Sequence, residues 1–149
     1  MYSFIIILTG ILGAVLTYFV STELKQGPVR ASAGLSLIVA ICFYYYADII
    51  ELFSLSVDSQ PEIMHEIPLV FIGASFIGMA SSEVLHSYIL LFVSGLIFSI
   101  IYLNTSRFFN GYGGALGTAA CISLIASLSL MIYTKRAEEK VKNRAQNKF

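Results

Sequence analysis

The sequence predicts an all-α integral membrane protein with about five transmembrane helices, and two observations carry this prediction. The chain of 149 residues is 57% hydrophobic and only 12% charged, and a soluble domain of this length cannot bury so much apolar surface. The apolar residues also come in continuous stretches, whereas the strands of a membrane barrel alternate apolar and polar residues. Helices are the expected spanning form because lipid offers the backbone no hydrogen-bond partner.

The apolar stretches are each close to the roughly 20 residues that cross the hydrocarbon core of a bilayer. They cover residues 3–22, 31–50, 67–85, 87–104 and 113–134. We therefore expect one transmembrane domain over residues 1–134 and a charged cytoplasmic tail over residues 135–149. The first stretch has no basic residue before it and no cleavage-type site after it, so we expect a retained helix rather than a signal peptide.

The distribution of basic residues predicts the orientation. If the N-terminus lies outside, Arg107 is the only outer Lys or Arg, which agrees with the positive-inside rule. We expect a protein integral to the cytoplasmic (inner or plasma) membrane, with the N-terminus outside and the C-terminus in the cytoplasm. The acidic segment between the second and third stretches then forms an outer connection, and Pro68 is expected in the first turn of the third helix. The inner basic residues are Lys25, Arg30, Lys135, Arg136, Lys140, Lys142, Arg144 and Lys148.

Small residues recur every four positions within the apolar stretches. This spacing is typical of helix faces on which backbones approach closely. The alternative is that the hydroxyl groups on these faces line a polar passage. The faces are Thr9, Gly13, Thr17 and Ser21; Ala74, Gly78 and Ser82; Gly95 and Ser99; and Ala115, Ala119, Ser123 and Ser127.

A short pattern occurs twice, sixty residues apart. Gly13-Ala14 is followed by Ser21 and Glu23, and Gly73-Ala74 is followed by Ser81 and Glu83 at the same offsets. Each copy is followed by another apolar stretch, so that each forms a pair of predicted helices, and the two pairs have the same orientation in the membrane. The pattern indicates a parallel tandem repeat of two helix hairpins plus a fifth helix, related by an axis along the membrane normal.

The candidate binding or transport residues lie at and near the two glutamates that end the two copies of the pattern. Ionisable residues at membrane depth are costly and therefore tend to be functional. We expect a site for a cation or proton at the inner mouth, formed by a small group of residues. The alternative is that the two glutamates extend to water or pair with Lys25 and Arg30. The candidates are Glu23, Glu83, His86, Arg30, Ser21 and Ser81.

No catalytic constellation, phosphate-binding loop or metal-type cysteine pair occurs in the sequence. We therefore expect no enzymatic activity, no cofactor and no metal site. Cys42 and Cys121 lie within apolar runs, where we expect them to be small buried residues.

The stretch ILGAVLTYFVSTELKQGPVRAS resembles the first hairpin of the MgtC-type membrane proteins. That hairpin has a glycine-rich helix that ends in an acid, followed by a Gly/Pro turn that carries an arginine and a hydroxyl residue. The spacing between Gly27 and Arg30 is shorter here than in that pattern. No matching helices follow, and the sequence has no soluble C-terminal domain. The matching positions are Gly13, Glu23, Gly27, Pro28, Arg30 and Ser32.

These features favour a small transporter-like or channel-like subunit for an ion or solute, embedded in the lipid bilayer and working as a homo-oligomer. The alternative is a non-transporting anchor or sensor subunit of a larger complex. Such a subunit would engage a protein partner through its cytoplasmic tail or its outer connection. Nothing in the sequence predicts a nucleic-acid partner.

Overall fold

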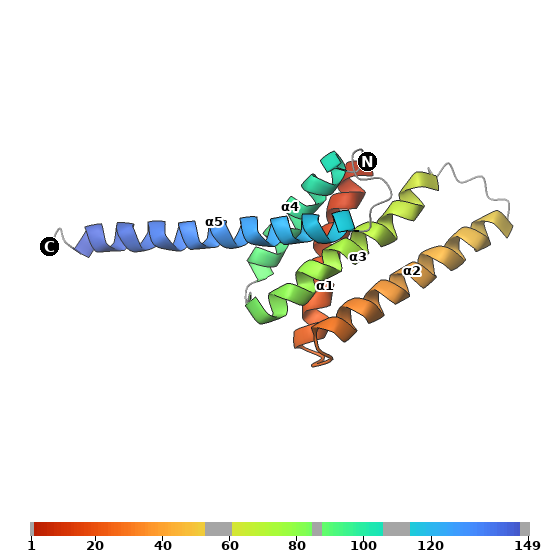
Figure 1. The fold of residues 1–149 in the computed structure, drawn as a ribbon, viewed down its shortest axis with the longest axis horizontal. Helices are drawn as coiled ribbons and strands as arrows, with labels where there is room; N and C mark the ends of the chain where they lie inside the picture. The colour runs from red at the N-terminus through yellow and green to blue at the C-terminus, as the bar shows by residue number, and fades with distance from the viewer. Residues whose placement is uncertain (1, 53–60, 85–87, 106–113, 147–149) are drawn as a thin grey trace.

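The computed structural model consists of five α-helices in the residues that it describes, which are 2–52, 61–84, 88–105 and 114–146, with side chains over 2–45, 65–80, 88–104 and 114–136. This confirms the all-α class (Figure 1). The helices are α1 (Tyr2–Thr22), α2 (Pro28–Leu52), α3 (Pro61–Val84), α4 (Tyr88–Thr105) and α5 (Gly114–Gln146).

Three of the helices are long and apolar enough to cross a membrane, judged on the described residues alone. The candidate spans are Tyr2–Thr22, Pro28–Tyr45 and Gly114–Arg136. The apolar parts of the other two helices, His65–Ala80 and Tyr88–Asn104, are shorter. Large apolar side chains lie exposed along the candidate spans, as at Leu37 and Ile125.

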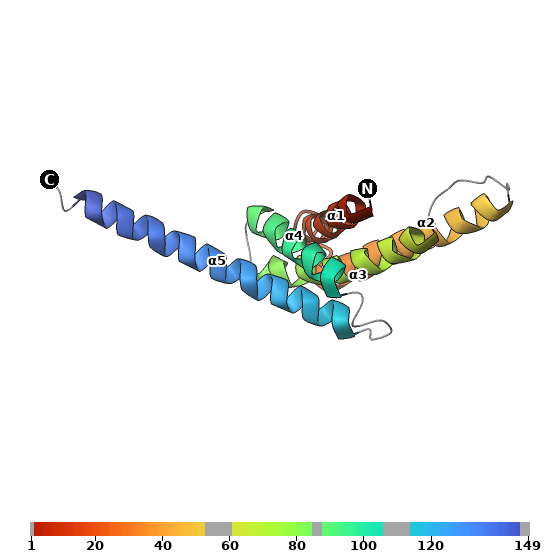
Figure 2. The ribbon, with the colours of Figure 1, turned by 90° about the horizontal axis from the view of Figure 1, so that it is seen from above.

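α3 is the central helix of the assembly, because it contacts each of the other four helices. α1 packs most extensively against α3 and α4 and also contacts α2. α2 runs beside α3, and α5 packs on α4 and α3 (Figures 1 and 2). α5 runs at a steep angle to α1, with which its described residues make no contact, and its C-terminal half extends away from the other helices (Figures 1 and 2).

The core lies where α1, α3 and α4 meet. Its fully buried apolar side chains include Ile6, Ile77, Leu91 and Phe98. The buried polar side chains of the described residues are all hydroxyls. They belong to Thr17, Ser21, Ser32, Ser75, Ser94, Ser99, Ser123 and Ser127.

A short turn joins α1 to α2. The Glu23 amide donates to the Phe19 carbonyl at 2.8 Å, which completes the last turn of α1. Lys25 and Gly27 then have positive φ values of 52° and 82°, a conformation that glycine adopts without steric cost. Pro28 occupies the first position of α2, where its missing N–H leaves no hydrogen bond unmade.

The prediction for Pro68 was wrong. α3 begins at Pro61, so Pro68 lies inside the helix, and residues assigned to the outer connection, including His65 and Glu66, belong to α3. The rule that places proline in a first helical turn holds for Pro61. The helix was underestimated because a hydropathy window ends where charged residues begin, whereas a helix continues through them.

The prediction for the two cysteines was also wrong. Cys42 on α2 and Cys121 on α5 are both free and exposed on the surface of the chain. Both helices have one face against their neighbours and a wide apolar face without a protein neighbour, and the cysteines lie on that outer face. An apolar sequence context therefore predicted contact with an apolar medium but not burial within the protein.

Candidate functional site

α1 and α3 make the most extensive contact between helices, and they cross at a point where only small residues fit. A Cβ atom added to Gly13 would lie 2.9 Å from Cβ of Ala74. A Cβ atom added to Gly78 would collide with the Ala14 carbonyl and lie 2.7 Å from Cβ of Thr17. The small residues predicted on these two faces therefore allow the backbones to touch, and the crossing leaves no room for even a methyl group.

Pairs of serine hydroxyls join two other pairs of helices. Ser32 of α2 and Ser75 of α3 are hydrogen-bonded at 2.8 Å, and Ser94 of α4 and Ser127 of α5 at 2.5 Å. Ser99 of α4 donates to its own helix, to the Gly95 carbonyl at 2.9 Å. Paired hydroxyls at helix contacts support the close-packing interpretation rather than the polar-passage alternative.

Thr17 is the exception among the buried hydroxyls. Its side chain is completely buried on α1 beside Gly78. Its Oγ1 atom is the only buried side-chain oxygen or nitrogen, in the part of the chain that the structure describes, without a hydrogen-bond partner. The tight contact with α3 leaves no space beside Thr17 for a ligand.

The two helix hairpins, α1–α2 and α3–α4, pack more extensively on each other than within themselves. α1 packs more extensively on α4 than on its own hairpin partner α2, and α3 packs more extensively on α2 than on α4. At the crossing Gly13 of the first copy meets Ala74 of the second, and the backbone of Tyr18 meets Gly78. α1 and α3 also run in the same direction, so that both C-terminal ends lie at one end of the molecule (Figure 1).

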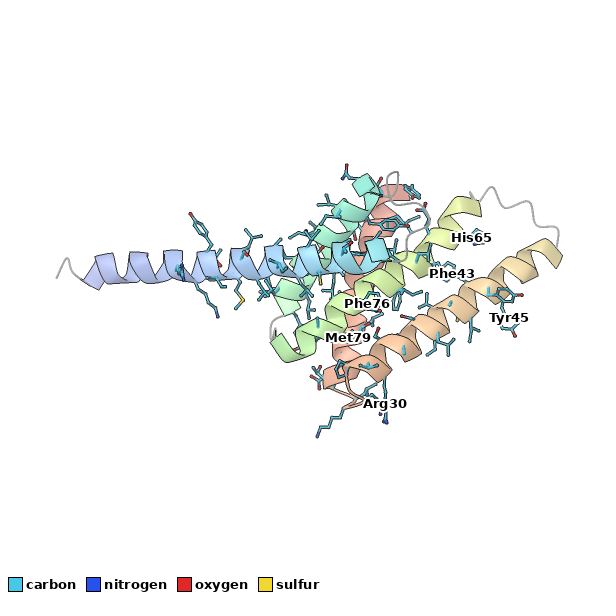
Figure 3. The ribbon with its side chains drawn as sticks, viewed as in Figure 1. Arg30, Phe43, Tyr45, His65, Phe76 and Met79 are labelled. Atoms are coloured by element: carbon cyan, nitrogen blue, oxygen red, sulfur yellow. The ribbon has the colours of Figure 1, made fainter. Side chains whose placement is uncertain are left out.

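The structure places the predicted site residues of the first hairpin at that end. Ser21 is buried in the last turn of α1, and Glu23 follows the helix as an exposed residue. Arg30 is exposed in the first turn of α2 (Figure 3). Among the described side chains, neither Lys25 nor Arg30 forms an ion pair with Glu23. The salt-bridge alternative therefore has no support here, and the alternative in which Glu23 extends to water agrees with its exposure.

The residues of the second copy are described less fully. Ser81 and Glu83 lie in the last turns of α3, and their side chains lie outside the described residues, as does His86 altogether. Glu83 therefore occupies the end of α3 that corresponds to the end of α1 carrying Glu23. The backbone brings the two copies of the pattern to one end.

Sequence reasoning missed a second ionisable position, Glu66, at the opposite end of the helices. The Tyr2 hydroxyl of α1 donates a hydrogen bond to Oε2 of Glu66, and Tyr102 of α4 lies within electrostatic reach of the same carboxylate. The helical spacing could have found it, because Glu66 precedes Val70, Ala74 and Ile77 on the buried face of α3 at intervals of three and four residues.

Comparison with known proteins gives no relative: no family model, no curated protein and no solved structure matches the chain. The resemblance to MgtC-type proteins thus stays limited to the residues that suggested it. Within the described residues, no group of three His, Cys, Asp or Glu side chains could hold a metal ion. The geometry of the chain is the basis for any functional conclusion.

Proposed function

We propose that the protein is an integral membrane subunit that conducts or transports a small cation. The observation that carries the proposal is the meeting of the C-terminal ends of α1 and α3 at one end of the molecule (Figure 1). A helix C-terminus carries partial negative charge, and Glu23 and Glu83 add a carboxylate to each end. Two such ends attract a cation more strongly than either end alone.

Membrane insertion is supported by the exposed apolar surface of the candidate spans. On α2 the exposed side chains include Leu37, Ile38 and Ile41, and on α5 they include Ile122, Ile125 and Ile132. Soluble proteins rarely expose apolar patches of this extent. A bilayer covers such faces without any need for a protein partner.

The path for a cation would involve more than one subunit. The crossing at Gly13 and Gly78 is closed by backbone contact, so that a path along α1 and α3 of one chain is blocked in this conformation. A homo-oligomer supplies additional walls, with Glu23 and Glu83 at the inner mouth. Arg30 and Lys25, which are exposed on the same side, would balance the carboxylates when no cation is bound.

Flux measurements on purified protein in liposomes test this proposal. We expect the double variant Glu23→Gln/Glu83→Gln to lose most of the cation flux of the wild type. Glu51→Gln, which removes a carboxylate from the predicted outer side, is the matched control and should leave the flux unchanged. Wild-type flux in the folded double variant would overturn the cation site.

A second candidate function, an anchor subunit for a partner protein, is favoured by the length of α5. The helix continues twelve residues beyond Thr134, to Gln146, and its Lys135 and Arg136 are exposed. A charged helix that leaves the membrane is a suitable attachment point. If this candidate is correct, a stoichiometric partner co-purifies in mild detergent and is lost when the residues after 135 are deleted.

A further inference from the structure

Glu66 is a half-buried carboxylate within the helix assembly. It lies in the second turn of α3, at the start of the apolar part of the helix and on the same face as the fully buried Val70 and Ala74. Ionisable residues in such a position are costly to maintain. Pro68, two residues further on, has no N–H and therefore leaves the Met64 carbonyl without its helical hydrogen bond.

Two phenol side chains from other helices face Glu66. Tyr2 of α1 donates its hydroxyl proton to Oε2 of Glu66. Tyr102 of α4 is close enough to interact electrostatically with the carboxylate, and its ring packs on Phe98 with the centroids 6.3 Å apart. The carboxylate thus lies where the ends of α1, α3 and α4 come together.

The other titratable side chains described at this end do not face the carboxylate. His65 precedes it on α3 and is exposed (Figure 3). Tyr44 and Tyr45 of α2 are exposed and pack on each other, with ring centroids 5.8 Å apart. The described first turns of α5 carry no titratable residue. Glu66 is therefore the only carboxylate among the described side chains at this end.

We propose that Glu66 is a proton-binding site whose occupancy controls how firmly the ends of α1 and α3 are joined. The surroundings suit a proton better than a metal ion, because calcium requires six to eight oxygen ligands and this site offers one carboxylate.

Protonation changes one hydrogen bond and breaks no covalent bond. A proton from water binds a carboxylate oxygen of Glu66, and the bond from Tyr2 then has a neutral acceptor. Hydrogen bonds with an ionised partner are about twice as strong as neutral ones. Since the crossing at Gly13 and Gly78 fixes the middle of both helices, the weakened contact loosens their outer ends first.

Hydrogen–deuterium exchange on the full-length protein in mild detergent tests the proposal and needs no transport assay, so that it is independent of the proposed function. On moving from neutral pH to a pH acidic enough to protonate carboxylates, with rates corrected for the intrinsic effect of pH, exchange at residues 2–9 should increase several-fold in the wild type. Glu66→Gln mimics the protonated state, so its exchange should be raised at neutral pH and should not change further. Tyr2→Phe should behave in the same way.

Two matched variants separate the site from general effects of acid. Glu23→Gln removes an exposed carboxylate at the opposite end, and Tyr44→Phe removes an exposed phenol of α2. Both should keep the wild-type response to pH. An unchanged pH response in folded Glu66→Gln would overturn the proposal, as would an equal loss of the response in Glu23→Gln.

Discussion

At the scale of single residues, the α1–α3 crossing depends on glycine at position 78. Gly78→Ala forces a methyl group against the Ala14 carbonyl and Thr17, and overpacking of this kind costs about 1–3 kcal/mol. Thermal unfolding in detergent, followed by circular dichroism, should show a lowered midpoint. Gly34→Ala is the matched control, because Gly34 lies on α2 with nothing within 4 Å.

The control should move in the opposite direction. Alanine is favoured over glycine in a helix by up to about 1 kcal/mol, so Gly34→Ala should unfold at the wild-type temperature or above. Equal destabilisation by both substitutions would show a general effect of replacing glycine in these helices, rather than a clash at the crossing. A Gly78→Ala variant as stable as the wild type would mean that the backbones do not touch there.

The four-residue spacing predicted which residues meet but not the hydrogen bonds that they make. Gly13, Ala74 and Gly78 were expected on contact faces, and they lie on them. The bond between Ser32 and Ser75 was not predicted, although Ser32 and Ser36 are four residues apart and both approach Ser75. Glu66 was assigned to a solvated connection because its charge dominated the local pattern, although its helical spacing from Val70 placed it on the buried face.

At the scale of helices, serine pairs connect α2 to α3. Ser32→Ala removes its bond to Ser75, whose hydroxyl keeps the Ile72 carbonyl as a partner at 2.7 Å. Bonds of this kind between transmembrane helices are worth about 0.6 kcal/mol, and we expect a loss of that size in the free energy of unfolding. Ser129→Ala is the control, since exposed Ser129 bonds within α5. A double-mutant cycle with Ser75→Ala measures the pair directly, and a coupling energy of zero would contradict the contact.

The α1–α2 turn depends on the positive φ of Gly27. Gly27 has nothing within 4 Å of an added Cβ, so that Gly27→Ala tests backbone conformation without a steric clash. An L-residue in the left-handed region costs about 1–2 kcal/mol, and the unfolding midpoint should fall accordingly. Gly117→Ala, in α5 and equally open, is the comparison. A turn that tolerates alanine would have to adopt another conformation.

At the scale of the whole molecule, helix positions were more predictable than their arrangement. Each apolar stretch contains most of one helix, because a continuous apolar segment in lipid can satisfy its backbone hydrogen bonds only as a helix. The angle between helices depends on side-chain contacts distant in sequence, such as Ser94 with Ser127. The steep angle between α5 and α1 (Figures 1 and 2) therefore could not be predicted from a hydropathy pattern.

The direction of α5 in the membrane decides where the C-terminus lies. If α1 crosses the bilayer along the membrane normal, the arrangement in Figure 1 places α5 close to the plane of the membrane. The basic residues after Thr134 favour a cytoplasmic C-terminus. A C-terminus on that side requires that α5 cross the bilayer, as α1 does. We therefore expect α5 to turn relative to α1 on insertion.

Labelling of single cysteines with a membrane-impermeant maleimide in intact cells measures this directly, in a background without Cys42 and Cys121. Cysteines at Gln26 and Gln146 should both be protected, and one at Ser59 should be labelled. If Gln146 is labelled while Gln26 is protected, α5 does not cross, and the five-span topology is wrong. The same result would place the charged end of α5 outside and remove the basis for a cytoplasmic partner.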